Sequence, residues 1–167
     1  GNPLFDVKGN RVTVKGIRFS GPEGDAGTDS FRDEHRSKCI RFNFGKISDQ
    51  ITATNPVSLL IENNEFFNWP GAGVAIDNKV MSLPDGSKMV DFDTAERIRI
   101  VGNYFHHNQQ QNAGYGVEIA GATYALIEQN TFDYNRHTIG STGGRKVIID
   151  GYGPQHGYKA YLNLVLP

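Results

Sequence analysis

The sequence lacks the features that mark several common classes of protein. Its 167 residues include one cysteine, Cys39, so no internal disulfide is expected and no cysteine cluster is available for a structural zinc site. No apolar run reaches the roughly 18 residues that suggest a membrane span, and no basic flank precedes an apolar segment at the start, so we expect neither a span nor an intact signal peptide. The net charge is −1 without blocks of like charge, so no nucleic acid partner is expected.

Familiar catalytic motifs and helical patterns are absent as well. The sequence has no glycine-rich phosphate loop, no G-x-S-x-G elbow, no H-E-x-x-H and no CxxC, so nucleotide-dependent chemistry and zinc hydrolysis are not expected. No stretch combines a cap with apolar residues at helical spacing. The composition, with 38% hydrophobic and 21% charged residues, favours one folded domain over residues 1–167.

Short β-type runs take the place of helices. Each has three residues, rich in branched side chains, between segments that contain turn-forming residues. The runs are Val12–Val14, Leu59–Ile61, Ile98–Ile100, Ala125–Ile127 and Val147–Ile149. Three residues make a weak independent strand, so we expect these runs to be parts of coils that stack on one another.

Most of these runs open a repeat of the form apolar-x-apolar-x-x-N-x-F-x-(x)-N. The central position holds Ile17, Asn64, Asn103 and Asn130. A second recurring segment follows each of the three central asparagines. It begins with glycine in Gly73–Ile76 and Gly116–Ile119 and is weaker in Thr138–Ile139. Each unit is therefore predicted to contain a strand, a turn, a second strand and a third strand that starts at or near a glycine.

The spacing of the central positions predicts the coils. Asn103 and Asn130 are 27 residues apart, which fits one coil. Asn64 and Asn103 are 39 apart, which fits one coil with an excursion near residues 77–97. Ile17 and Asn64 are 47 apart, which fits either one coil with a long loop or two coils. We predict two coils, the second built on Cys39–Phe44. Further excursions are expected near residues 21–37 and 140–158.

These units resemble the repeats of right-handed parallel β-helix proteins, the pectate-lyase-like superfamily. That superfamily includes a periplasmic copper-maturation repeat family, polysaccharide lyases, pectin hydrolases, alginate epimerases and phage tailspikes. The resemblance extends from about Val12 to the last residue. It implies an all-β fold, a right-handed, single-stranded parallel β-helix of about six coils. Apolar side chains would stack at roughly 4.8 Å, and turn asparagines tolerate left-handed backbone while their amides would bond along the stack.

The candidate site comes from residues that do not follow the repeat. The third position after the central asparagine holds Phe67, His106 and Asp133, and the fourth holds Asn68, His107 and Tyr134. His106 is therefore expected beside Asp133, and His107 beside Tyr134. A carboxylate can orient an imidazole for acid–base catalysis, and an arginine can stabilise negative charge. The predicted catalytic residues are His106, Asp133, Arg136 and His137; the alternative is a polar ladder without catalytic function.

Two further sets of residues are weaker candidates. Tyr152 and His156 are similar to the Tyr-Gly and Pro-x-His elements of alginate epimerases, although paired aspartates are missing. The alternative is a turn with an exposed histidine and aromatic residue. The predicted substrate-binding residues are His107, Tyr134, Tyr152 and His156. Asp91 and Asp93 offer carboxylates for calcium, against a solvated loop as the alternative. The expected cofactor is accordingly none, or calcium.

Two functions stay open. The first is an extracellular carbohydrate-active β-helix, a lyase, hydrolase or epimerase that acts on a polysaccharide along one face of the coils. The second is a non-catalytic β-helix module for glycan binding or for surface or filament assembly. The resemblance implies a glycan partner and a secreted or cell-surface location in both. No capping helix is apparent at either end, so we expect one or both caps to be missing and either a longer β-helix or end-to-end self-association.

Overall fold

The computed structural model describes residues 3–9, 11–22, 37–43, 58–78, 98–110, 112–121, 124–142 and 157–167. Within these ranges every regular element is a β-strand. The strands are β1 Phe5–Val7, β2 Arg11–Lys15, β3 Arg18–Ser20, β4 Lys38–Asn43, β5 Ser58–Glu62, β6 Glu65–Phe67, β7 Ala72–Asn78, β8 Ile98–Val101, β9 Tyr104–His106, β10 Tyr115–Gly121, β11 Tyr124–Glu128, β12 Thr131–Asp133, β13 His137–Thr142, β14 Gly157–Tyr161 and β15 Leu164–Val165.

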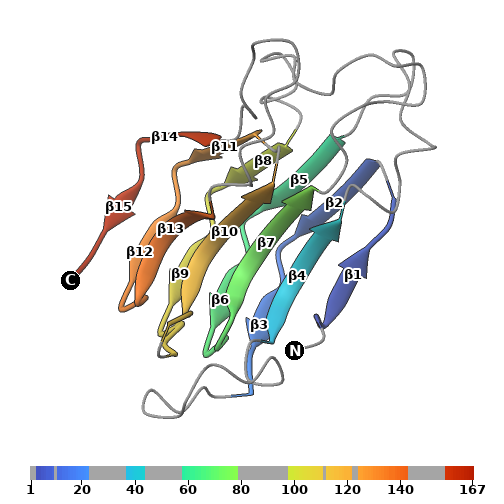
Figure 1. Ribbon diagram of the computed structural model, residues 1–167. Helices are drawn as coiled ribbons and strands as arrows, with labels where there is room; N and C mark the ends of the chain where they lie inside the picture. Colours follow the sequence, from blue (N-terminus) through green and yellow to red (C-terminus); the bar gives the residue numbers. More distant parts are fainter. Residues whose placement is uncertain are drawn as a thin grey trace, which may run out of the picture.

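The strands form three parallel sheets, each with five strands in the described part of the chain (Figure 1). Sheet A has the order β1-β4-β7-β10-β13, sheet B has β2-β5-β8-β11-β14, and sheet C has β3-β6-β9-β12-β15. The chain runs through a strand of sheet B, then of sheet C, then of sheet A, and repeats. The predicted all-β character and parallel pairing are confirmed, and the three stacked sheets are the arrangement expected of a parallel β-helix.

Strand register confirms the repeat that the sequence predicts. In sheet B, Ile61 pairs with Ile100, which pairs with Ile127. In sheet A, Val117 pairs with both Val74 and Ile139. The second recurring segment of the sequence therefore forms the third strand of each coil. Equivalent residues of successive coils therefore lie side by side.

Sheet C contributes a column of phenylalanine rings to the core. The centroids of Phe19 and Phe66 are 5.1 Å apart, those of Phe66 and Phe105 are 4.9 Å apart, and those of Phe105 and Phe132 are 5.1 Å apart. The last three rings are fully buried. Because side chains alternate along a strand, the residues on either side of each phenylalanine point outward. The core column thus determines which residues of sheet C meet solvent.

The prediction of two coils between Ile17 and Asn64 is wrong. Strand β2 pairs directly with β5, with Val14 opposite Ile61, so one coil spans this interval. The segment around Cys39 is strand β4, which lies between β1 and β7 in sheet A. Its buried Ile40 and Phe42 alternate as in β7 and β10, which makes it the third strand of the same coil.

Hydrogen bonds along the stack form the predicted asparagine ladder. The side-chain oxygens of Asn64, Asn103, Asn130 and Asn163 each accept from the backbone N–H of the equivalent residue one coil earlier. The left-handed backbone lies one residue before each ladder position rather than at the ladder asparagines themselves. The residues there are Gly16, Asn63, Gly102, Gln129 and Leu162, all with positive φ. Glycine and asparagine adopt this conformation readily, whereas the other two are held in it by the turn.

Parts of the predictions lie outside the described residues. They include most of the three excursions, at 23–36, 79–97 and 143–156, and the run Val147–Ile149. At the far edges of the sheets, Phe5 is 49% exposed and Leu164 is 54% exposed. End-to-end self-association stays a prediction.

Candidate functional site

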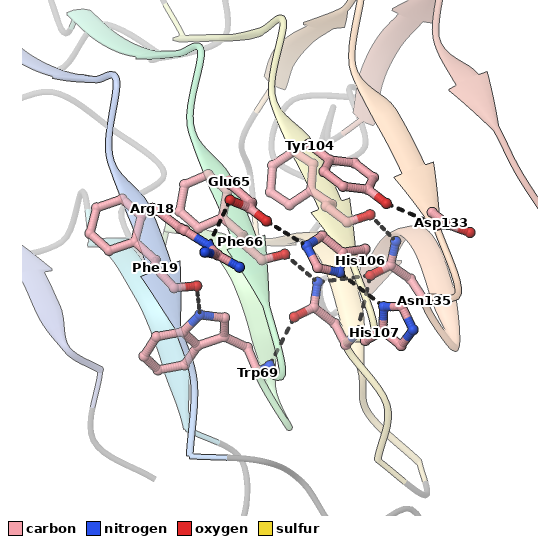
Figure 2. Close-up of polar contacts among 12 residues, drawn as sticks. Arg18, Phe19, Glu65, Phe66, Trp69, Tyr104, His106, His107, Asp133 and Asn135 are labelled. Carbon is pink, nitrogen blue, oxygen red and sulfur yellow. Dashed lines mark hydrogen bonds and ion pairs between the residues drawn. The ribbon is translucent and has the colours of Figure 1, made fainter.

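The outward side of sheet C carries a continuous row of polar and aromatic side chains. We call this the outer face of sheet C and define it by the residues that flank the buried phenylalanines. They are Arg18, Ser20, Glu65, Phe67, Tyr104, His106, Thr131 and Asp133. Figure 2 shows that Arg18 and His106 both point toward Glu65, whereas Asp133 lies beside the hydroxyl of Tyr104.

Both predicted neighbour pairs occur. Asp133 is the register partner of His106 in sheet C. One residue further on, the rings of His107 and Tyr134 stack at 5.5 Å with 10° between their planes. Both residues have left-handed backbone, with φ of 53° and 49°. Counting from the central asparagine therefore placed these four residues correctly.

The imidazole of His106 is tightly surrounded. Its Nε2 is 3.0 Å from Oε1 of Glu65, and its Nδ1 is 2.9 Å from Nδ1 of His107. The ring stacks with Phe67 at 5.0 Å and with Tyr104 at 4.3 Å. Only 13% of the side chain is exposed. Both ring nitrogens of His106 thus have protein partners.

The carboxylate bonded to His106 is therefore Glu65, not Asp133. Asp133 instead accepts a hydrogen bond from the hydroxyl of Tyr104 at 2.9 Å (Figure 2). Desolvation and, secondarily, this bond and the charges of Asp133 and Glu65 raise the pKa of Tyr104 above its ordinary value of 10.0.

Sequence reasoning missed Glu65, although a signal for it existed. Glu65 is the first residue after the central Asn64, so it faces outward like His106 but one strand earlier. Its other oxygen, Oε2, is 2.9 Å from Nε of Arg18, and that guanidinium lies 4.8 Å from the ring centre of Phe67. Diagonal neighbours of this kind lie within reach of long side chains.

Arg136 and His137 form a separate cluster. His137 opens β13 in sheet A and stacks on Tyr115 at 4.7 Å, while Nη1 of Arg136 donates to the carbonyl oxygen of Gln110. Among the described residues, the side-chain contacts of this pair share no member with those of His106. Although His137 is exposed, desolvation of its ring lowers its pKa below 6.5, and the charge of Arg136 lowers it further.

The other candidate residues have no described environment. Tyr152, His156, Asp91 and Asp93 all lie outside the described residues. In the described ranges, no three histidine, cysteine, aspartate or glutamate side chains come together to hold a metal ion. The same ranges contain no helix long and apolar enough to traverse a bilayer. Cys39 is a free, fully buried thiol whose pKa is raised by burial.

Comparison with protein-family models, with curated proteins and with solved structures finds no match. The resemblance to pectate-lyase-like proteins therefore stays a prediction.

Proposed function

We propose that the protein acts on a polysaccharide that lies along the outer face of sheet C and the turn after it, with His106 and His107 carrying out acid–base catalysis. The observation that supports this most directly is the chain of contacts Arg18–Glu65–His106–His107 (Figure 2). It joins three successive coils and ends at an exposed imidazole. A polysaccharide partner would place the protein outside the cell or at its surface.

These four residues are connected in the order that acid–base catalysis requires. Arg18 holds one oxygen of Glu65, the other oxygen of Glu65 holds His106, and His106 holds His107. An imidazole oriented by a carboxylate transfers protons near neutral pH, and a third group that orients the carboxylate makes the geometry more rigid.

The surface around this chain suits a sugar polymer. Coils repeat at roughly 4.8 Å along the stack, so side chains recur regularly beneath an extended ligand. Tyr134 is 57% exposed, and one side of its ring is supported by His107. Exposed aromatic rings with a polar edge provide apolar contacts to sugars.

A non-catalytic glycan-binding module is the second candidate. It is favoured by the pairing of both carboxylates, Glu65 with Arg18 and Asp133 with Tyr104, and by the stacking of His106 on Phe67. Such mutual contacts stabilise a polar ladder whether or not it reacts with a ligand.

Product release and binding, measured on the same panel of neutral and anionic polysaccharides, separate the two functions. The wild type is compared with a His106→Gln/His107→Asn double variant, in which asparagine tolerates the left-handed backbone at 107. The matched control is Lys15→Gln/Glu62→Gln, which removes the 2.9 Å ion pair between Lys15 and Glu62 on sheet B.

We expect the histidine variant to bind the polysaccharide but to release product at least ~100-fold more slowly, and the control to behave as wild type. Binding without product in the wild type would support the non-catalytic module. A wild-type protein that binds no member of the panel would contradict both functions. Each assay is run with calcium and with chelator, which tests the predicted calcium site at Asp91 and Asp93.

A further inference from the structure

We infer that the proton acceptor of this site is Nε2 of His107, and that His106 and Glu65 are positioning residues that take up the resulting positive charge. This inference rests on the proposed function and assigns a role to each ring nitrogen of His106 and His107. It differs from the sequence-based expectation, in which His106 itself reacts beside Asp133.

The hydrogen-bond partners determine the tautomer of His106. Both oxygens of Glu65 are engaged, Oε2 with Arg18 and Oε1 with His106. A carboxylate beside a guanidinium is ionised and only accepts hydrogen bonds. Nε2 of His106 must therefore carry the proton, and in the neutral ring Nδ1 is left with a lone pair.

The tautomer of His107 then follows. Its Nδ1 lies 2.9 Å from Nδ1 of His106, and one of these two nitrogens has to donate. Because Nδ1 of neutral His106 is the acceptor, Nδ1 of His107 carries the proton. This leaves Nε2 of His107 with a lone pair, and the described residues provide no hydrogen-bond partner for it.

Exposure also favours His107 over His106 as the acceptor. His106 has 13% of its side chain exposed, and its ring stacks with Phe67 and Tyr104. His107 is exposed and is held from one side by Tyr134. A bound polysaccharide can reach the free nitrogen of His107, whereas both nitrogens of His106 already have partners.

The proton transfers balance between the sugar, His107 and His106. Nε2 of His107 takes a proton from a hydroxyl or carbon acid of the sugar, which leaves the negative charge on the sugar. The Nδ1 proton of His107 moves to Nδ1 of His106, so His107 becomes neutral again with its proton on Nε2. The positive charge then resides on His106, 3.0 Å from the carboxylate of Glu65. The reverse sequence returns a proton to the leaving group or product.

Nitrogen-15 NMR of the imidazoles tests the tautomers without any substrate. At pH about 8, where an ordinary imidazole is neutral, we expect His106 as the Nε2–H form, His107 as the Nδ1–H form, and a scalar coupling between their Nδ1 atoms. Glu65→Gln should convert part of His106 to the other tautomer. The matched control Glu62→Gln should not, although Glu62 and Glu65 have the same 29% exposure and the same 2.9 Å ion-pair distance. His107 found as the Nε2–H form in the wild type would overturn the inference.

The roles of His107, His106 and Glu65 are tested by steady-state kinetics on a polysaccharide that the wild type converts. His107→Asn should lower kcat at least ~100-fold. His106→Phe, which keeps the ring stack, should lower kcat by ~10-fold or more, and Glu65→Gln should lower kcat with KM unchanged. Glu62→Gln should leave both constants unchanged. A His106→Phe variant with wild-type kcat would overturn the relay. If the wild type converts no polysaccharide, the proposed function and the acceptor role both fail, and the NMR result then describes a polar ladder.

Discussion

Asn64 donates two hydrogen bonds to the side-chain oxygen of Asn103, one from its backbone N–H at 2.9 Å and one from its amide at 3.0 Å. Asn103 makes the same pair of bonds to Asn130, both at 2.9 Å. Its amide also donates to the carbonyl oxygens of Ile61 and Val101. One buried side chain therefore satisfies polar groups in its own coil and in the coils on both sides.

Replacing Asn103 by alanine should destabilise the protein by more than about 2 kcal/mol, because each buried polar group left unpaired costs roughly 1–3 kcal/mol. Urea denaturation followed by circular dichroism measures the change. The control is Asn63→Gly, at a turn position with φ of 53° that glycine tolerates. Equal losses in the two variants would show that the ladder contributes no more than an ordinary turn residue.

Gly116, the second residue of β10, is predicted to be required for packing. A Cβ at Gly116 would lie 2.8 Å from Cδ1 of Phe132 and 2.8 Å from the carbonyl oxygen of Thr138. Gly116→Ala should therefore lower the free energy of unfolding by about 1–3 kcal/mol through overpacking. Gly16→Asn is the control, since nothing lies within 4 Å of its Cβ position and asparagine accepts φ of 69°. The packing argument fails if the two changes in unfolding free energy are the same.

The bond between Tyr104 and Asp133 should be visible in the titration of the phenol. Asp133→Asn removes the negative charge, so the pKa of Tyr104 should move down toward 10.0 while remaining raised by desolvation and by the charge of Glu65. NMR of carbon-labelled tyrosine, assigned with Tyr104→Phe, measures this pKa. Asp6→Asn on β1 removes an aspartate charge from sheet A and should leave the titration unchanged. An unchanged pKa in Asp133→Asn would contradict the role assigned to Asp133.

The titration of His137 should depend on Arg136. Its pKa in the folded protein lies below the ordinary 6.5, so the unfolded chain binds this proton more tightly. The contribution of His137 to stability is therefore constant above pH 6.5 and decreases as the pH falls from that value through the lowered pKa. Arg136→Gln should raise the pKa and weaken this dependence, whereas Lys15→Gln on sheet B should not. Proton NMR of His137 reports the pKa directly, and no rise in Arg136→Gln would refute the assigned role of the charge.

The sequence by itself determined the parts of this protein that repeat. Residues at the same offset from a ladder asparagine have to pair when coils stack, which is why Phe66 lies over Phe105 and Asp133 pairs with His106. Side-chain alternation then separates the buried phenylalanines from the outward residues of sheet C.

The tertiary structure alone decided the coil count near the start and the partner of His106. Loops of any length can leave a solenoid between strands, so the 47 residues from Ile17 to Asn64 did not distinguish one coil from two. His106 lies between two strands that each offer a carboxylate, Glu65 and Asp133. Arg18 orients the first and Tyr104 engages the second, so competition among side chains from four strands selects Glu65. The sequence shows that Glu65 and Asp133 are both possible partners of His106. It does not show which of them bonds to His106, because that depends on distances between side chains of different coils.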